Sequence, residues 1–204
     1  MPPTTFNIKI YSDTVCPWCY IGLKTLEHSI HLFKTTYPIA SHDIFSITWS
    51  PYYLNPFAPT PGILASTRIA QKNGAERAEG IKLRLSRVGR AHGINFTFSG
   101  KVGNTRDSHR LILLAGQKGE DVQGRVVEEF FRDHFEGEGD VSLRCDLVKG
   151  GEEVDREAGR ARDSGVTSVP TFEINGKRLE GAEDPSAFYE MFAEIKAREQ
   201  ETSG

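Results

Sequence analysis

The sequence predicts an α/β protein in which a βαβ unit and a ββα unit are separated by a long helical segment. Alternating apolar residues at 6–13 predict a strand, and a helical stripe separates it from a second alternating run at 45–49. Helical periodicity then extends from about residue 63 to 135. Asn175-Gly176 joins two short strand-like runs, which is typical of a β-hairpin, and an amphipathic helix follows.

Length and composition describe an ordinary globular protein. The chain has 204 residues, 38% of them hydrophobic, which suits one domain or a small domain with a large insertion. A net charge of -3 argues against a nucleic-acid partner, because phosphate binding needs a basic surface. No apolar run approaches the ~20 residues that cross a bilayer, and residues 1–5 do not resemble a secretory signal. We therefore expect a cytoplasmic protein without a membrane partner.

Each predicted element depends on the spacing of its apolar residues. The first helix is expected to end at Pro38, and its stripe is Cys19, Leu23, Leu26, Ile30 and Phe33. Three helices are expected in the central segment, marked by Ile81, Leu85 and Val88, by Leu111, Leu114 and Ala115, and by Val122, Val126, Val127, Phe130 and Phe131. The charged stretch 150–163 predicts a solvated helix with i,i+4 ion pairs. Asp184-Pro185 should cap the last helix, whose buried face is Phe188, Met191, Phe192 and Ile195.

Cys16-Pro17-Trp18-Cys19 follows the first strand and opens the first helix, which predicts a redox-active dithiol. Cys16 falls at the N-cap and Pro17 at the first helical position, so unpaired amides and the helix dipole should stabilise the Cys16 thiolate. Cys19 lies on the apolar stripe and should be more buried. We therefore expect Cys16 to attack a disulfide and Cys19 to resolve the mixed disulfide.

The dipeptide between the cysteines predicts further properties. Trp18 lies off the apolar stripe, so we expect it to face solvent beside the thiol and offer apolar area to a substrate, although a core tryptophan is the alternative. Neither Pro17 nor Trp18 is a cation, so the disulfide should be less oxidising than one in a motif that contains histidine.

A zinc site is the competing interpretation of the cysteine pair. Cys16, Cys19, His28 and His31 have suitable spacings, but helical geometry turns both histidines away from the stripe that contains Cys19. We therefore predict no metal. Cys145 is a lone cysteine, either a free thiol or a third redox thiol.

Several motifs together resemble a known family. They are residues 13–22 around the cysteines, residues 49–56, Asn104-Thr105 with His109-Arg110-Leu111, Phe135-Glu136-Gly137, and Pro170 just before a strand. This set resembles the DsbA-like branch of the thioredoxin superfamily, and within it the FrnE-like subgroup. The resemblance implies a thioredoxin fold, made of residues 1–60 and 165–204, with a helical domain inserted at 61–164.

The resemblance also implies a substrate site. It identifies Pro170 as a cis-proline that faces the cysteines, with backbone groups of Val169 turned toward the sulfurs, whereas a trans turn proline is the alternative reading. It places Asn104 and His109 beside the active-site groove, although a surface or ion-paired histidine is the default interpretation. Together with Pro17 and Trp18 these residues form the expected substrate-binding set. The stretch 140–164 is shorter than is usual in the family, which affects the substrate side of the inserted domain.

The expected function is that of a thiol-disulfide oxidoreductase acting on peptide or small-molecule disulfides. No bound cofactor is expected, and glutathione or another thiol would serve as reductant or co-substrate. The alternative is a glutathione-dependent isomerase or transferase that resembles 2-hydroxychromene-2-carboxylate isomerases and kappa-class glutathione transferases, with a role in secondary metabolism. Those enzymes typically have a single serine in place of the first cysteine, so Cys19 favours redox chemistry. A third alternative is a non-catalytic module that binds peptides through Trp18 and the Pro170 groove.

Overall fold

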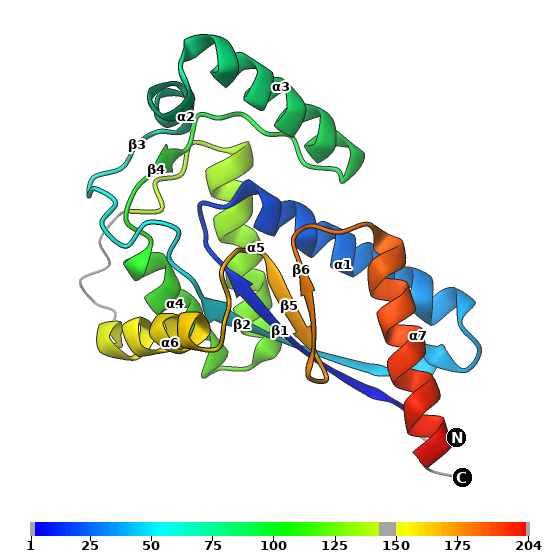
Figure 1. The fold of residues 1–204 in the computed structure, drawn as a ribbon. Helices are drawn as coiled ribbons and strands as arrows, with labels where there is room; N and C mark the ends of the chain where they lie inside the picture. The colour runs from blue at the N-terminus through cyan, green and yellow to red at the C-terminus, as the bar shows by residue number, and fades with distance from the viewer. Residues whose placement is uncertain (1–2, 143–149, 203–204) are drawn as a thin grey trace.

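A computed structural model describes residues 3–142 and 150–202 (Figure 1). The described elements occur in the predicted order, with helices between a βαβ unit and a ββα unit. The first unit consists of β1 (Thr5–Ser12), α1 (Pro17–Thr36), the short 3-10 helix η1 (Ala40–His42) and β2 (Ile44–Pro51). The last unit consists of β5 (Thr171–Ile174), β6 (Lys177–Glu180) and α7 (Pro185–Thr202).

The central segment holds five helices and a small second sheet in its described part. Its elements are β3 (Ile63–Leu64), α2 (Ala65–Asn73), α3 (Ala75–Ala91), β4 (Lys101–Val102), α4 (Arg106–Gly116), α5 (Glu120–Glu136) and α6 (Gly151–Asp163). Three of these elements, β3, β4 and α2, are not predicted from the sequence. The predicted helices at 81–88, 111–115, 122–131 and 150–163 correspond to α3, α4, α5 and α6.

The main sheet has the order β2-β1-β5-β6. β1 pairs parallel with β2, and the remaining pairs are antiparallel. Phe6, Ile8 and Ile10 alternate along β1 and are buried on one face, where α1 and α7 lie side by side (Figure 1). On the other face, Tyr11 packs against Ala161 of α6. Because β1 ends at Ser12 and α1 begins at Pro17, a short loop connects the carboxyl end of the strand to the first turn of the helix.

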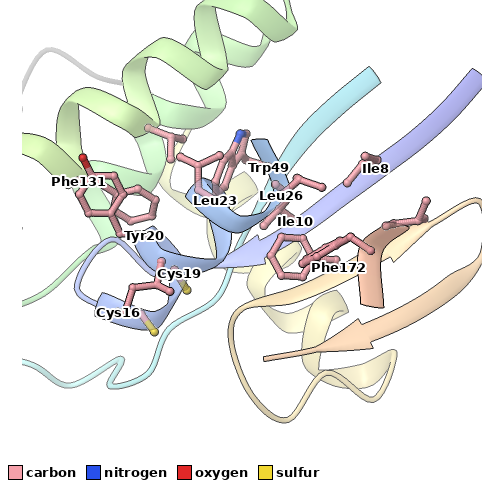
Figure 2. Packing of buried hydrophobic residues seen from close by; sticks show 14 of the residues in the cluster. Ile8, Ile10, Cys16, Cys19, Tyr20, Leu23, Leu26, Trp49, Phe131 and Phe172 are labelled. Atoms are coloured by element: carbon pink, nitrogen blue, oxygen red, sulfur yellow. The ribbon is translucent and has the colours of Figure 1, made fainter. Parts of the chain in front are cut away.

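One hydrophobic core joins the sheet to the central helices. Tyr20 of α1 stacks near Phe131 of α5 with ring centroids 5.2 Å apart, and Trp49 of β2 contacts the same ring at 6.1 Å (Figure 2). The Tyr20 hydroxyl also donates a hydrogen bond to Glu136 at 2.7 Å. This core contains residues from all three predicted ranges, 1–60, 61–164 and 165–204, and the division into domains stays a prediction.

Two predicted helix faces differ from the structure. Leu114 was expected on the buried stripe of α4, but it is 40% exposed, and the buried face instead contains Ser108, His109, Ile112 and Ala115. The charged helix α6 is solvated as predicted, with an i,i+4 pair between Glu152 and Arg156, yet it also buries Val154 against the molecule. In α4 polar residues lie on the buried face and an apolar residue lies on the exposed face, so the spacing of apolar residues did not indicate the buried face correctly.

Candidate active site

The cysteine motif occupies the first turn of α1, as predicted. Cys16 is the N-cap residue in an extended conformation, and Pro17 begins the helix. The Cys16 amide donates to the Asp13 carbonyl at 3.0 Å, and the Cys19 amide donates to the Cys16 carbonyl at 3.0 Å. These bonds place the end of β1, the first cysteine and the second cysteine in one short, well-defined segment.

Both thiols are free and both lie in the core, with Cys19 the more buried at 1% exposed against 4% for Cys16. Figure 2 shows both sulfurs on the same side of the start of α1. Burial raises the pKa of Cys19 well above its ordinary value, and a hydrogen bond and the charge of Cys16 raise it further. Hydrogen bonds from Ser12 and the Asp13 backbone act in the opposite direction. Cys19 is therefore a protonated thiol at neutral pH.

The proline loop lies against the first cysteine. The Val169–Pro170 peptide bond is cis, and the Cys16 thiol donates to the Val169 carbonyl with a sulfur–oxygen distance of 3.5 Å. Gly22 permits this approach, because a Cβ atom there would lie 3.0 Å from Pro170 and 3.0 Å from Phe172. The expected cis-proline and the expected orientation of Val169 toward the sulfurs are thus present.

A cavity of about 870 Å³ opens in front of Cys16 and extends to α2 and α3. Cys16, Pro17, Trp18 and Val169 line it. Trp18 is half-buried rather than fully solvent-facing, and the Arg84 guanidinium of α3 lies 5.4 Å from the centre of its ring. The motif itself supplies no cation, as noted from the sequence, but α3 brings one to the tryptophan.

The other two expected substrate residues lie behind this cavity and are not among its lining residues. His109 is buried rather than on the surface, and its Nε2 lies 3.4 Å from Asp13 Oδ1, which matches the ion-paired half of the default interpretation. The Asn104 side chain donates to the Pro56 carbonyl at 3.2 Å and accepts from the Arg106 amide at 3.0 Å, which holds the start of α4. Both residues support the walls of the site, and a direct contact with substrate stays a prediction.

Sequence reasoning missed the far wall of the cavity. Arg68, Ile69 and Lys72 come from α2, and Phe96 and Phe98 come from the loop between α3 and β4. α2 buries no residue, so its sequence has no apolar stripe that would have indicated a helix. Asp13 was noted within the family motif but was not assigned a role. Its Oδ2 accepts the Leu54 amide at 2.8 Å and so joins the cysteine loop to the cavity rim.

The structure gives no support to a zinc site. His28 and His31 are both exposed on α1. Among residues 3–142 and 150–202, no group of three or more His, Cys, Asp or Glu side chains is placed to hold a metal. In the same part of the chain, no helix is both long and apolar enough to cross a membrane. Cys145 lies outside the described residues.

Solved structures with the same fold include enzymes of more than one kind. A probable DsbA oxidoreductase from Streptomyces coelicolor superposes with a TM-score of 0.79 at 21% identity, covering 94% of this chain and 90% of that one. A 2-hydroxychromene-2-carboxylate isomerase gives 0.64 at 14% identity, covering 97% and 100%. The cytosolic disulfide reductase DsbM from Pseudomonas aeruginosa gives 0.53 at 14% identity, covering 94% and 98%.

No curated protein sequence matches the chain. The family model described as a DSBA-like thioredoxin domain, however, matches residues 7–149. This range contains the cysteine motif, α1 and most of the inserted helices. With the thioredoxin-like sheet, the cis-proline opposite Cys16 and the helical insertion, the match shows that the chain belongs to the DSBA-like thioredoxin domain family.

Proposed function

We propose that the protein is a thiol-disulfide oxidoreductase in which Cys16 attacks the substrate disulfide and Cys19 resolves the product. The observation that carries this proposal is the placement of two free thiols in one helical turn, the first at the cavity and the second hydrogen-bonded behind it. Cys16 is the N-cap residue of α1, so its sulfur lies at the end of the helix where the first amides have no partner within the helix. The raised pKa of Cys19 keeps the second sulfur protonated until the first has reacted.

The proposed reaction has two exchange steps. The Cys16 thiolate attacks one substrate sulfur, a Cys16–substrate disulfide forms, and the other substrate sulfur leaves as a thiolate that takes a proton. Cys19 then loses its proton and attacks the Cys16 sulfur, which releases the second substrate thiol and forms the Cys16–Cys19 disulfide. The substrate gains two electrons and the dithiol loses two. Two molecules of a thiol such as glutathione return them and become a disulfide.

Pro17, Trp18, Val169 and Pro170 are proposed to hold the substrate beside Cys16. The first three line the cavity, and the Val169 carbonyl already faces the sulfur. An extended peptide segment would pair with the backbone of Val169, as strands do at a sheet edge. Asn104 and His109 would act by supporting the walls.

Glutathione in the cytoplasm is the proposed source of electrons. DsbM is named a cytosolic disulfide reductase, and a second structure of it, at a TM-score of 0.50 and 13% identity, is described as solved with GSH. A reducing compartment would keep the dithiol reduced and ready to attack.

A glutathione-coupled insulin-reduction assay tests the proposal. Cys16→Ser should abolish turnover, and retained turnover in that variant would contradict the proposed mechanism. Cys19→Ser should lose multiple turnovers and accumulate a covalent Cys16–glutathione adduct, seen as a mass increase that a reductant reverses. Circular dichroism of both variants checks that each is folded.

A glutathione-dependent isomerase is the second candidate, favoured by the match to 2-hydroxychromene-2-carboxylate isomerase along nearly all of both chains. Such an enzyme needs no resolving thiol. In an isomerisation assay with glutathione and a 2-hydroxychromene-2-carboxylate substrate, a Cys19→Ser variant would then retain full turnover. A role in secondary metabolism would follow only in that case.

A further inference from the structure

The cavity in front of Cys16 is lined mainly by apolar side chains. Its volume of about 870 Å³ lies within the range that small-molecule sites occupy, roughly 300–1,000 Å³. The apolar lining contains rings and branched side chains from four segments of the chain. They are Trp18, Ile69, Ile81, Leu85, Phe96 and Phe98. Such a lining favours a ligand with an aromatic or other apolar body.

The exposed charges on the cavity are both positive. Arg68 and Lys72 are four residues apart on α2, so they lie on the same side of that helix, and both line the cavity. Neither has an ion-pair partner among residues 3–142 and 150–202. Unpaired cations beside an apolar lining favour a ligand that also carries negative charge.

No acidic group on the lining offsets these cations at the surface. Asp13 is the acid among the described lining residues, and it is 1% exposed. Its two oxygens face the Leu54 amide at 2.8 Å and His109 Nε2 at 3.4 Å. Apart from the reacting Cys16, the remaining ionisable residue of the described lining is His134, which is also buried, and burial lowers the pKa of its ring, which keeps it neutral at pH 7.

We propose that this cavity selects small disulfides that combine an aromatic or apolar body with a carboxylate or another anionic group. The inference rests on the proposed redox function and names its substrate class. The carboxylate would face Arg68 and Lys72 while the apolar body contacts the phenylalanine rings, leaving the disulfide beside Cys16. Cys16 then forms a mixed disulfide with one half, and the other half leaves as a thiolate. Cys19 releases the first half, and both halves leave as thiols.

The test compares three disulfide probes with the reduced protein by stopped-flow absorbance or thiol titration. They are the aromatic dianion 5,5′-dithiobis(2-nitrobenzoate), the neutral aromatic 2,2′-dithiodipyridine and the aliphatic dication cystamine. Each rate is divided by the rate of the same probe with glutathione, which removes differences in intrinsic reactivity. We expect the normalised rate to favour the dianion over the dication by about tenfold or more, because cationic clefts raise the on-rates of anions. The preference should weaken as salt screens it.

The double variant Arg68→Gln/Lys72→Gln should remove about tenfold of that preference while leaving the neutral probe unchanged. Arg77→Gln/Arg90→Gln is the matched control, because it removes two exposed cations from α3 that do not line the cavity. Equal effects of the two double variants, or no effect of the first, would overturn the inference. Since all four substituted residues are exposed, both double variants are expected to fold, and circular dichroism checks this.

A binding arm separates this inference from the redox function. 2-Naphthoate should slow the alkylation of Cys16 by iodoacetamide, measured by peptide mass mapping, and 1-naphthylmethylammonium should not. If Cys16 reacts with every probe at the same normalised rate and neither naphthalene compound protects it, the inference fails while the oxidoreductase stands. If Cys16 reacts with no disulfide at all, the proposed function itself fails.

Discussion

The helix that carries the two cysteines and the helix that faces them across the cavity are held in opposite ways. α1 crosses the core, with Leu26 and Phe33 fully buried and Tyr20 packed on α5. α2 buries no residue, and its main contacts are with α3 and the small β3–β4 sheet. The reacting sulfurs are therefore positioned by the core, whereas the part of the opposite wall that comes from α2 is positioned by a helix on the surface.

This difference separates two tasks of the site. Positions of the sulfurs must be maintained to within a fraction of an ångström for an exchange reaction, which packed elements provide. Selection of the substrate needs only a wall of suitable shape and charge. Residues on a weakly packed helix can change with little effect on stability, so such a wall can be altered without harming the dithiol.

The largest expected effect on the free energy of unfolding comes from a substitution in the core near the cysteines. Phe172 is fully buried and contacts the ring of Phe188 at 4.9 Å between centroids, so Phe172→Ala should lower the free energy of unfolding by about 3–5 kcal/mol. Ile69→Ala on α2 should lower it by about 1 kcal/mol or less. Urea denaturation followed by circular dichroism measures both. Similar costs at the two positions would contradict the difference between the helices.

The same substitution placed in each region sharpens the comparison. Gly22→Ala puts a methyl group 3.0 Å from Pro170 and Phe172, which are both buried and cannot move aside. Overpacking should cost about 1–3 kcal/mol and lower the rate of disulfide reduction by displacing Pro170. Gly80→Ala on α3 meets nothing within 4 Å and should instead stabilise the helix, by about 0.5–1 kcal/mol.

Activity and denaturation are measured on both glycine variants. Insulin reduction should be unchanged in Gly80→Ala and reduced severalfold in Gly22→Ala. An active and more stable Gly22→Ala protein would show that the close approach of α1 to the proline loop is not required.

The pH dependence of stability tests the burial of Cys19. Since its pKa is raised in the folded protein, the unfolded chain releases the proton first, near its ordinary value of 9.0. The stabilisation is therefore fully present below pH 9 and is lost as the pH rises above it, by at most ~1.4 kcal/mol per pH unit. Reduced wild-type protein should lose stability between pH 8 and 10, whereas Cys19→Ala should lose less.

Measurements stay below pH 10 because Tyr20 and Tyr53 also have raised pKa values and add loss of the same sign above it. Guanidinium or urea titrations in the presence of dithiothreitol give the free energies. The same slope in wild type and Cys19→Ala would mean that the second thiol is not the buried, protonated group described here.

Elements that bury an apolar face could be predicted from the sequence. The stripe that ends at Phe33 gave α1, and Asn175-Gly176 gave the β5–β6 hairpin, because burial imposes a period on the residue types. α2 could not be found this way, since Ile69 is the one large apolar residue among its nine and none of them is buried. In α4 the buried face includes Ser108 and His109, so the predicted stripe is right at Ala115, which is buried, and wrong at Leu114, which is exposed.

The site divides in the same manner. Cys16, Cys19 and Pro170 belong to local motifs, and their N-cap, burial and cis bond follow from neighbouring residues and family resemblance. The cavity wall depends on segments far from Cys16 in sequence that only the fold brings together. Asp13 and His109 meet for that reason as well, and no pattern in the sequence indicates their contact.

The smallest expected effect on stability comes from an ion pair on the surface, between α4 and α6, that belongs neither to α1 nor to α2. Asp155 of α6 accepts hydrogen bonds from Arg106 Nε and Nη2 of α4 at 3.0 and 2.8 Å and from the Tyr53 hydroxyl at 3.0 Å. The Arg106 hydrogen bond lowers the pKa of Asp155, so this stabilisation is present above the unfolded value near ~4 and is lost as the pH falls below it.

Asp155→Asn should therefore be less stable than wild type by under ~1 kcal/mol at pH 7, because both partners are largely exposed and solvent screens the pair. The gap should narrow as the pH falls below about 4. Glu153→Gln changes an exposed residue of the same helix that has no hydrogen bond or ion pair to α4 among the described residues, so it is the matched control and should show no such pH dependence. A gap of several kcal/mol would mean that α6 depends on this ion pair for its position, and that surface contacts hold the inserted helices as firmly as the core holds α1.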